Sequence, residues 1–195
     1  MTGHPAKEVE LAVLEALDRG DLNGAATTAI RGYGAAVLTY LRSVLRDEPR
    51  AGDAFSQWAE CLWRGLGGFR REASVRSWIF RLAWNCALHV RDEAWNRKGR
   101  RFETGDASAL AESIRTRTAV AMEGRRRALD ELRRELSHED ETLLVLRIDQ
   151  ELSWKEISDV LTREEGAAVD ANALMKRFER LRDRLRRMAA KRGLL

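Results

Sequence analysis

The sequence predicts an all-α fold in which two small helical domains are joined by a polar linker. Three observations lead to this prediction: 34% of the 195 residues are charged, only 2 are proline, and apolar side chains recur with helical spacing. No segment shows the alternation of apolar and polar residues that is typical of strands. We expect the first domain at residues 1–96, the linker at 97–127 and the second domain at 128–195.

Four helices are expected in the first domain. Their predicted ranges are Glu8–Asp18, Ala25–Arg46, a third helix that ends at Leu66, and Val75–Asp92. The second helix is expected to stop before Asp47-Glu48-Pro49, and Asp53 is expected to cap the third helix. Five of the 6 tryptophans lie between residues 58 and 95, which predicts a dense core in this domain.

The second domain is expected to contain a helix-turn-helix. The predicted helices are Ala128–Leu136, Glu139–Ile148, Trp154–Leu161 and a terminal helix to about Arg192, and the linker has patchy helical character over 109–123. Ser153 and Glu156 have the S-x-x-E spacing of a capping box. Either Asp170 or Asn172 caps the terminal helix. The turn Thr162–Val169 is longer than the roughly 3–4 residues that are usual for this motif.

Charge is distributed unevenly along the second domain. Residues 129–170 carry 5 basic and 13 acidic side chains, a net charge of −8, whereas residues 174–192 carry 9 basic and 2 acidic ones, a net charge of +7. The terminal helix has an apolar seam of Leu174, Phe178, Leu181, Leu185 and Met188, and a basic stripe of Lys176, Arg180, Arg184, Arg187 and Lys191. Such a helix can pack on its domain and face phosphate groups at the same time. A solvated basic face without a ligand is the alternative.

The helix expected over Val75–Asp92 also has two distinct sides. Its core stripe consists of Val75, Ile79, Leu82, Cys86 and Val90, and its other side carries Phe80, Trp84 and Leu88 among Arg76, Arg81 and Arg91. Rings that stack on bases, beside guanidinium groups that neutralise phosphate, are typical of surfaces that bind single-stranded nucleic acid. The alternative is a central helix packed on both sides, with Phe80 and Trp84 in the core.

The sequence offers little support for an enzyme, a metal site or a cofactor. We find no nucleophile with a base, no pair of carboxylates, no metal-ligand spacing and no phosphate-binding glycine loop. Cys61 and Cys86 lie far apart in the sequence and neither belongs to a CxxC motif. Because no signal peptide and no uncharged run of about 18–20 residues is visible, we expect a cytoplasmic protein without membrane insertion.

Two segments resemble the extracytoplasmic-function (ECF) RNA polymerase sigma factors of the sigma-70 superfamily. Residues 65–85 have the sequence GLGGFRREASVRSWIFRLAWN, which is similar to the family's FRGEASLRTWLFRIARN signature. Residues 152–161, LSWKEISDVL, resemble the family's LSYEEIAEIL, and residues 174–186 resemble its recognition helix. The two motifs occur in the family's order, about 80 residues apart, within the family's usual length.

The resemblance implies a non-enzymatic subunit that binds core RNA polymerase and directs promoter-specific initiation. The first domain would open the −10 promoter element and the second would recognise the −35 element. The implied −10 contacts are Arg70, Arg71, Ser74, Arg76, Trp78, Arg81, Trp84 and Asn85, and the implied −35 contacts are Asn172, Lys176, Arg177, Arg180 and Arg184. Asp53 and Trp58 would contact the polymerase, the linker would thread its active-site channel, and an anti-sigma factor is an expected partner.

The chain departs from the family pattern in three places. In the family, an acidic stretch contacts the polymerase, and of its acidic residues only Asp53 is clearly present in this chain. At the position of Trp84 the family has arginine. About six residues, Thr162–Ala167, are inserted before the recognition helix. No function is assigned to the residues before Ala25. A stand-alone helix-turn-helix regulator or adaptor without polymerase binding is therefore the alternative function.

Overall fold

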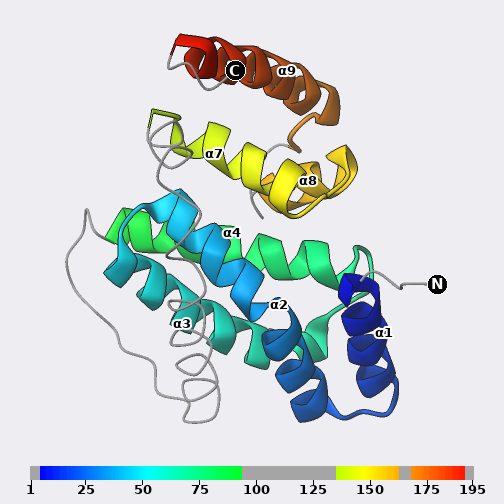
Figure 1. Ribbon diagram of the computed structural model, residues 1–195. Coiled ribbons are helices and arrows are strands. Elements are labelled where there is room, and N and C mark those ends of the chain that lie inside the picture. Colours follow the sequence, from blue (N-terminus) through cyan, green and yellow to red (C-terminus); the bar gives the residue numbers. More distant parts are fainter. Residues whose placement is uncertain (1–4, 94–134, 163–167, 192–195) are drawn as a thin grey trace. The chain divides into compact units, whose positions relative to one another are not determined.

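The computed structural model describes residues 5–93, 135–162 and 168–191, and every regular element in these ranges is a helix (Figure 1). The predicted all-α class is therefore confirmed. The chain divides into two compact units, Met1–Val120 and Ala121–Leu195. The expected linker at 97–127 and most of the helix expected over 128–136 lie outside the described residues.

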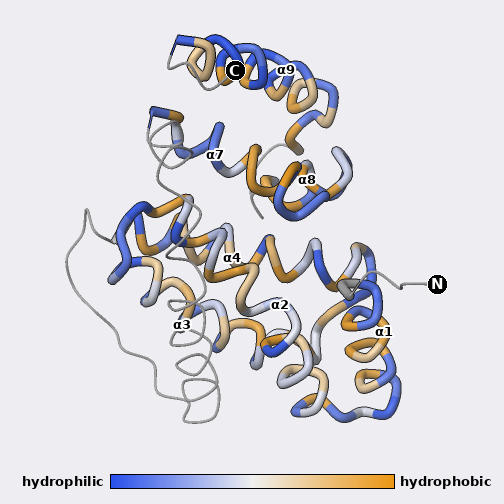
Figure 2. Tube along the Cα trace, in the orientation of Figure 1, coloured by the Kyte–Doolittle hydropathy of each residue, from blue (hydrophilic) through white to orange (hydrophobic). Residues whose placement is uncertain are grey.

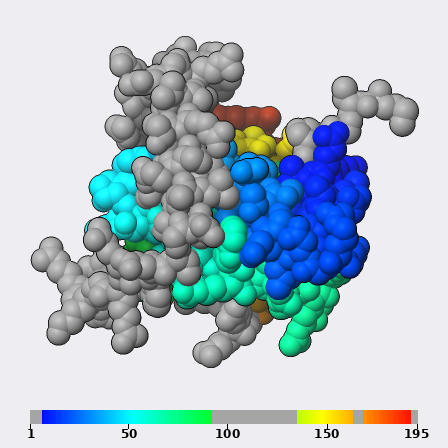
Figure 3. Space-filling model, turned by 90° about the horizontal axis from the view of Figure 1, so that it is seen from below, coloured from blue at the N-terminus to red at the C-terminus, as the bar shows by residue number. Residues whose placement is uncertain are grey.

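The described part of unit 1 is built from helices that pack on one another in sequence order. They are α1 (Pro5–Asp18), α2 (Leu22–Leu45), α3 (Glu48–Gly65), the 3-10 turn η1 (Leu66–Gly68) and α4 (Val75–Glu93). α1 lies beside α2 (Figures 1 and 3). α2 and α3 both pack on α4 (Figure 1). At Gly32 of α2, a Cβ atom would come within 2.4 Å of Val9 Cγ1 of α1, so this close approach requires glycine.

A capping aspartate starts α2 earlier than expected. The Oδ1 atom of Asp21 accepts a hydrogen bond of 2.8 Å from the backbone N–H of Gly24. This bond satisfies one of the N–H groups that have no partner inside the first helical turn. α2 therefore begins at Leu22 rather than at Ala25.

The prediction that Asp53 caps α3 is wrong, because Asp47 is the cap. Asp47 Oδ1 accepts a hydrogen bond of 2.9 Å from the backbone N–H of Arg50. Pro49 lies in the first turn of α3, where its missing N–H costs nothing because no helical partner exists there. Arg46, with φ of 52°, ends α2 in the left-handed conformation. The segment that was expected to break helices thus ends one helix and starts the next.

Aromatic side chains form the centre of the unit 1 core. Trp58, Phe55 and Phe80 are fully buried, at 0% exposure. Trp58 stacks on Phe55 with 5.1 Å between ring centroids and donates its Nε1–H to the carbonyl of Ile79 at 3.2 Å. Tyr40 of α2 meets Phe80 edge to face at 5.6 Å. Side chains of both α2 and α3 therefore cover α4.

The described part of unit 2 contains α7 (His138–Leu144), the π-helical turn η2 (Val145–Asp149), α8 (Trp154–Leu161) and α9 (Ala171–Lys191). The helix expected over Glu139–Ile148 is only partly correct, since its second half is the π-helical turn. The predicted capping box is confirmed: Ser153 N donates to Glu156 Oε2 at 2.8 Å, and Glu156 N donates to Ser153 Oγ at 3.3 Å.

α8 and α9 are the two helices of the expected helix-turn-helix, and they pack against each other. Of the two candidate caps, Asp170 is the one observed, since its Oδ1 accepts a hydrogen bond of 3.1 Å from Asn172 N. Ser158 Oγ of α8 donates to the carbonyl of Val169 at 2.5 Å, and Val169 N donates to Thr162 Oγ1 at 3.2 Å. These bonds anchor the start of α9 to α8, although the connection is long.

Candidate nucleic-acid interface

α9 packs on unit 2 with one face and exposes a basic face on the other. Leu174 and Leu181 are buried, and Phe178 meets Trp154 of α8 with 5.4 Å between ring centroids. The basic face consists of Lys176, Arg180, Arg184, Arg187 and Lys191, all of which are exposed. Most of α9 is accordingly hydrophilic, with apolar positions at helical intervals (Figure 2). The expected apolar seam and basic face are therefore both present on this helix.

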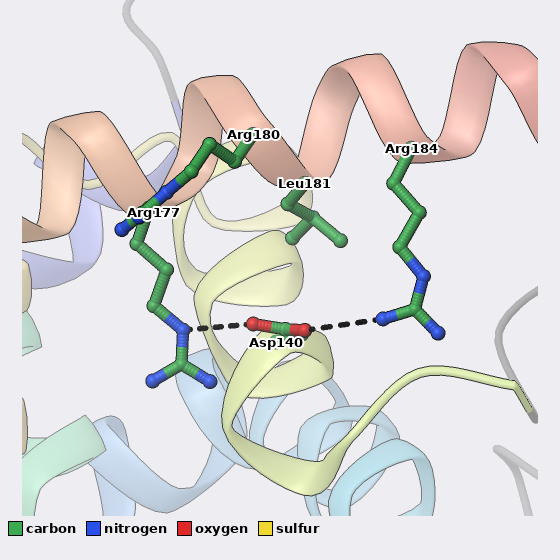
Figure 4. A pocket seen from close by; sticks show the side chains of 5 residues that line it. All are labelled: Asp140, Arg177, Arg180, Leu181 and Arg184. Carbon is green, nitrogen blue, oxygen red and sulfur yellow. Dashed lines mark hydrogen bonds and ion pairs between the residues drawn. The ribbon is translucent and has the colours of Figure 1, made fainter.

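Asp140 of α7 lies between two arginines of α9 (Figure 4). Arg177 Nε donates to Asp140 Oδ1 at 2.8 Å, and Arg184 Nη1 lies 3.8 Å from Asp140 Oδ2. The Asp140 side chain is only 17% exposed, whereas those of Arg177 and Arg184 are 40% and 47% exposed. Together with Arg180 and Leu181, these side chains line an open pocket, and Arg180 extends away from the carboxylate.

Further contacts within unit 2 occupy the guanidinium groups of Arg177 and Arg184. Arg177 Nη2 lies 4.0 Å from Glu139 Oε2, and Arg184 Nη2 donates to the carbonyl of Glu135 at 3.0 Å. The sequence left open whether the acidic segment neutralises the basic helix. The structure shows that it does so at these two positions.

The other expected −35 contacts lie at the surface of α9. Asn172, Lys176 and Arg180 are exposed, and within the described part of the chain neither Lys176 nor Arg180 forms an ion pair. All three occupy the first half of the helix. The first half of α9 therefore presents Lys176 and Arg180 to an anionic partner without a competing carboxylate from the described residues.

The expectation that Trp84 stacks on unpaired bases is wrong. Trp84 is 7% exposed, Phe80 is 0% exposed, and the buried Nε1–H of Trp84 has no hydrogen-bond partner in the described structure. The physical reason is that α4 is packed on more than one side, by α2, α3 and α1. The alternative interpretation of this helix, with both rings in the core, is therefore the correct one.

The arginines that precede α4 remain at the surface. Arg70 and Arg71 are both exposed, and Arg71 has φ of 60°. The Arg71 guanidinium pairs with Asp18 at the end of α1. Because half or more of each side chain is exposed, this ion pair contributes about 0–1 kcal/mol. The loop thus keeps its basic side chains accessible, but Arg71 already has an acidic neighbour.

A carboxylate of α1 occupies the N-terminus of α4. Glu10 Oε1 accepts a hydrogen bond of 2.7 Å from Val75 N, and its Oε2 lies 3.3 Å from Arg76 N and from the Tyr33 hydroxyl. Ser74 Oγ also caps this end, accepting from Ser77 N at 3.0 Å. Burial, followed by the charge of Glu10, raises the pKa of Tyr33. The residues before Ala25, which were assigned no role, therefore supply a structural cap.

Replacing Glu10 with alanine is expected to lower the free energy of unfolding by about 0.5–2 kcal/mol, because two N–H groups lose their acceptor. Urea denaturation followed by circular dichroism measures this change. Glu8→Ala is the matched control, since Glu8 is exposed on the same helix and its substitution should stay within about 0.5 kcal/mol. If the two variants were equally stable, the Glu10 cap would make no measurable contribution to the free energy of unfolding.

The remaining −10 candidates are half-buried on α4. These residues are Arg76, Trp78, Arg81 and Asn85. Trp78 packs against Phe69 with 5.3 Å between ring centroids. The Nε atom of Arg81 is buried and has no hydrogen-bond partner in the described structure. Each side chain keeps some solvent contact, so a ligand could reach parts of this row without the core being opened.

The two expected polymerase contacts have different environments. Asp53 is exposed on α3. The assignment of Trp58 to a polymerase surface is wrong, because its side chain is fully buried and its Nε1–H is bonded to the carbonyl of Ile79. The hydrophobic periodicity of α3 places Trp58 on the buried face, and a match in sequence position to a family motif carries no information about burial.

No family model matches the chain, and no curated protein matches it either. Among the described helices, none is long and apolar enough to span a membrane. The described residues also contain no cluster of three or more His, Cys, Asp or Glu side chains that could hold a metal ion.

Proposed function

We propose that this chain is a transcription initiation subunit similar to the ECF sigma factors, which binds core RNA polymerase and promoter DNA. The observation that carries the proposal is the exposed basic face of α9, the second helix of a helix-turn-helix. The two sequence motifs that resemble the family support the same function. The proposed activity includes no catalytic step and takes place in the cytoplasm.

In this proposal, α9 recognises duplex DNA at the −35 element. Its 21 residues extend over about 30 Å at ~1.5 Å per residue, and an α-helix fits the major groove. Asn172, Lys176 and Arg180 approach the base edges and nearby phosphates, while Arg187 and Lys191 contact the backbone. Arg177 and Arg184 contribute less, because a phosphate must compete with Asp140 for them.

Unit 1 would contact the polymerase through Asp53 and the opened −10 strand through its exposed and half-exposed side chains. Arg70 is exposed and has no acidic neighbour to displace among the described residues, and Arg71 joins it when the DNA displaces Asp18. Trp78 supplies the aromatic surface in place of the buried Trp84. An anti-sigma factor that covers these surfaces is part of the same proposal.

Reconstituted transcription with core polymerase on a random promoter library tests the proposal. We expect run-off transcripts from a subset of templates that share two elements, one near −35 and one near −10. Because the contacts are mostly to phosphates, the yield should fall steeply as salt rises. Core polymerase alone is the control. A chain that neither captures core polymerase nor directs a specific transcript would contradict the proposal.

One observation favours a second candidate, a helix-turn-helix regulator that acts without polymerase. Trp58 is buried, so Asp53 is the only one of the two expected polymerase contacts that lies at the surface of the described structure. Under the first proposal, Asp53→Ala weakens capture of core polymerase and leaves duplex binding unchanged. Under the second, the chain binds a specific duplex alone, and Asp53→Ala changes neither measurement.

A further inference from the structure

The two cysteines, which are far apart in the sequence, meet between α3 and α4. Cys61 lies in α3 and Cys86 in α4, two helices that pack against each other. The two side chains are hydrogen-bonded. Cys61 is exposed, whereas Cys86 is only 7% exposed, so a reagent in solution has much better access to Cys61. Two thiols in contact across neighbouring helices satisfy the first requirement for a disulfide.

The surroundings make the two thiols chemically unequal. The hydrogen bond from Cys86 lowers the pKa of Cys61 to about 7, and the nearby charge of Arg64 acts in the same direction. Partial burial and the Glu60 carboxylate, which is paired with Arg64 at 2.6 Å, oppose this effect. The hydrogen bond with Cys61 and burial raise the pKa of Cys86. Cys61 is therefore the more acidic of the two thiols.

We propose that Cys61 and Cys86 form a redox-active pair that hydroperoxides oxidise to an intramolecular disulfide. The accessible thiolate of Cys61 attacks one oxygen of the hydroperoxide and the O–O bond breaks, which yields Cys61 sulfenic acid and, after proton uptake, an alcohol or water. The Cys86 sulfur then attacks the Cys61 sulfur and releases water. In total, the thiols lose two electrons and two protons, and the hydroperoxide is reduced to an alcohol (or water) and one water.

This reaction would link α3 to α4 covalently. Cys61 lies about two turns from Asp53 along α3, so the bond would form on the helix that carries the proposed polymerase contact. A dithiol reductant would reverse the reaction by thiol–disulfide exchange. The Cys61–Cys86 pair depends only on the packing of α3 against α4. The proposal that it is redox-active therefore does not depend on the proposed function.

The test is oxidation of the reduced full-length chain by stoichiometric hydrogen peroxide near pH 7, followed by peptide mapping without reductant. We expect both thiols to disappear together into a Cys61–Cys86 linked peptide, and dithiothreitol to restore them. In Cys86→Ala, Cys61 should accumulate as sulfenic acid that dimedone traps. In Cys61→Ala, Cys86 should stay reduced because the peroxide does not reach it.

The pH dependence of Cys61 alkylation by iodoacetamide supplies an independent readout. The midpoint is expected near pH 7 in the native chain and at a higher pH in Cys86→Ala, because the donated hydrogen bond is lost. Circular dichroism checks that both variants fold. The proposal is overturned if oxidised native protein contains only cross-linked dimers or over-oxidised Cys61 while Cys86 stays free. An unchanged alkylation midpoint in a folded Cys86→Ala chain would overturn it as well.

Discussion

Trp84→Ala is expected to lower the free energy of unfolding by about 3–5 kcal/mol, because it empties a large buried site between α4 and its neighbours. Urea denaturation followed by tryptophan fluorescence measures the change, since five of the 6 tryptophans belong to the sequence of unit 1. A base-stacking residue would behave differently. Its loss would slow promoter opening and leave stability near the native value.

Trp84→Phe is the matched control for this prediction. It keeps most of the buried ring and removes a buried Nε1–H that has no hydrogen-bond partner in the described structure. The cost of the smaller ring is therefore partly offset, since an unsatisfied buried donor costs about 1–3 kcal/mol. We expect Trp84→Phe to be much less destabilising than Trp84→Ala. If alanine and phenylalanine had equal, small effects, the side chain would not be a core residue.

Arg180→Ala is expected to weaken specific duplex binding by about 1–3 kcal/mol, which corresponds to roughly 5- to 150-fold in affinity. Arg180 is exposed and forms no ion pair within the described residues, so thermal stability should hardly change. Fluorescence anisotropy on a duplex selected from the promoter library measures the affinity at several salt concentrations. If Arg180 contacts a phosphate, the salt slope should fall by about 0.9.

Arg182→Ala is the control on the same helix. Arg182 is exposed but lies outside the basic face, and its Nε is 3.8 Å from the neighbouring Asp183. Its substitution should leave specific affinity nearly unchanged. Equal losses for Arg180→Ala and Arg182→Ala would mean that only overall charge matters, and the assignment of Arg180 to a recognition surface would be wrong.

Short-range patterns in the sequence were sufficient to predict most helices. The Ser153–Glu156 capping box, the helix after it and the two faces of α9 depend on residues within a few turns of one another. Prediction failed where two local signals conflicted, as at Pro49, which can end a helix or occupy its first turn. Local periodicity also could not show that α7 changes into a π-helical turn.

The sequence by itself determined the all-α class, the helix-turn-helix and the basic face of α9, because propensity, capping and periodicity are local properties. Only the tertiary structure decided which surfaces stay accessible. α4 carries apolar residues on two sides, so its neighbours decide that Trp84 is buried. Glu10 and Asp140 find their partners 65 and 37 residues away, and Cys61 finds Cys86 across two packed helices. Such pairings depend on how helices pack, which no local pattern specifies.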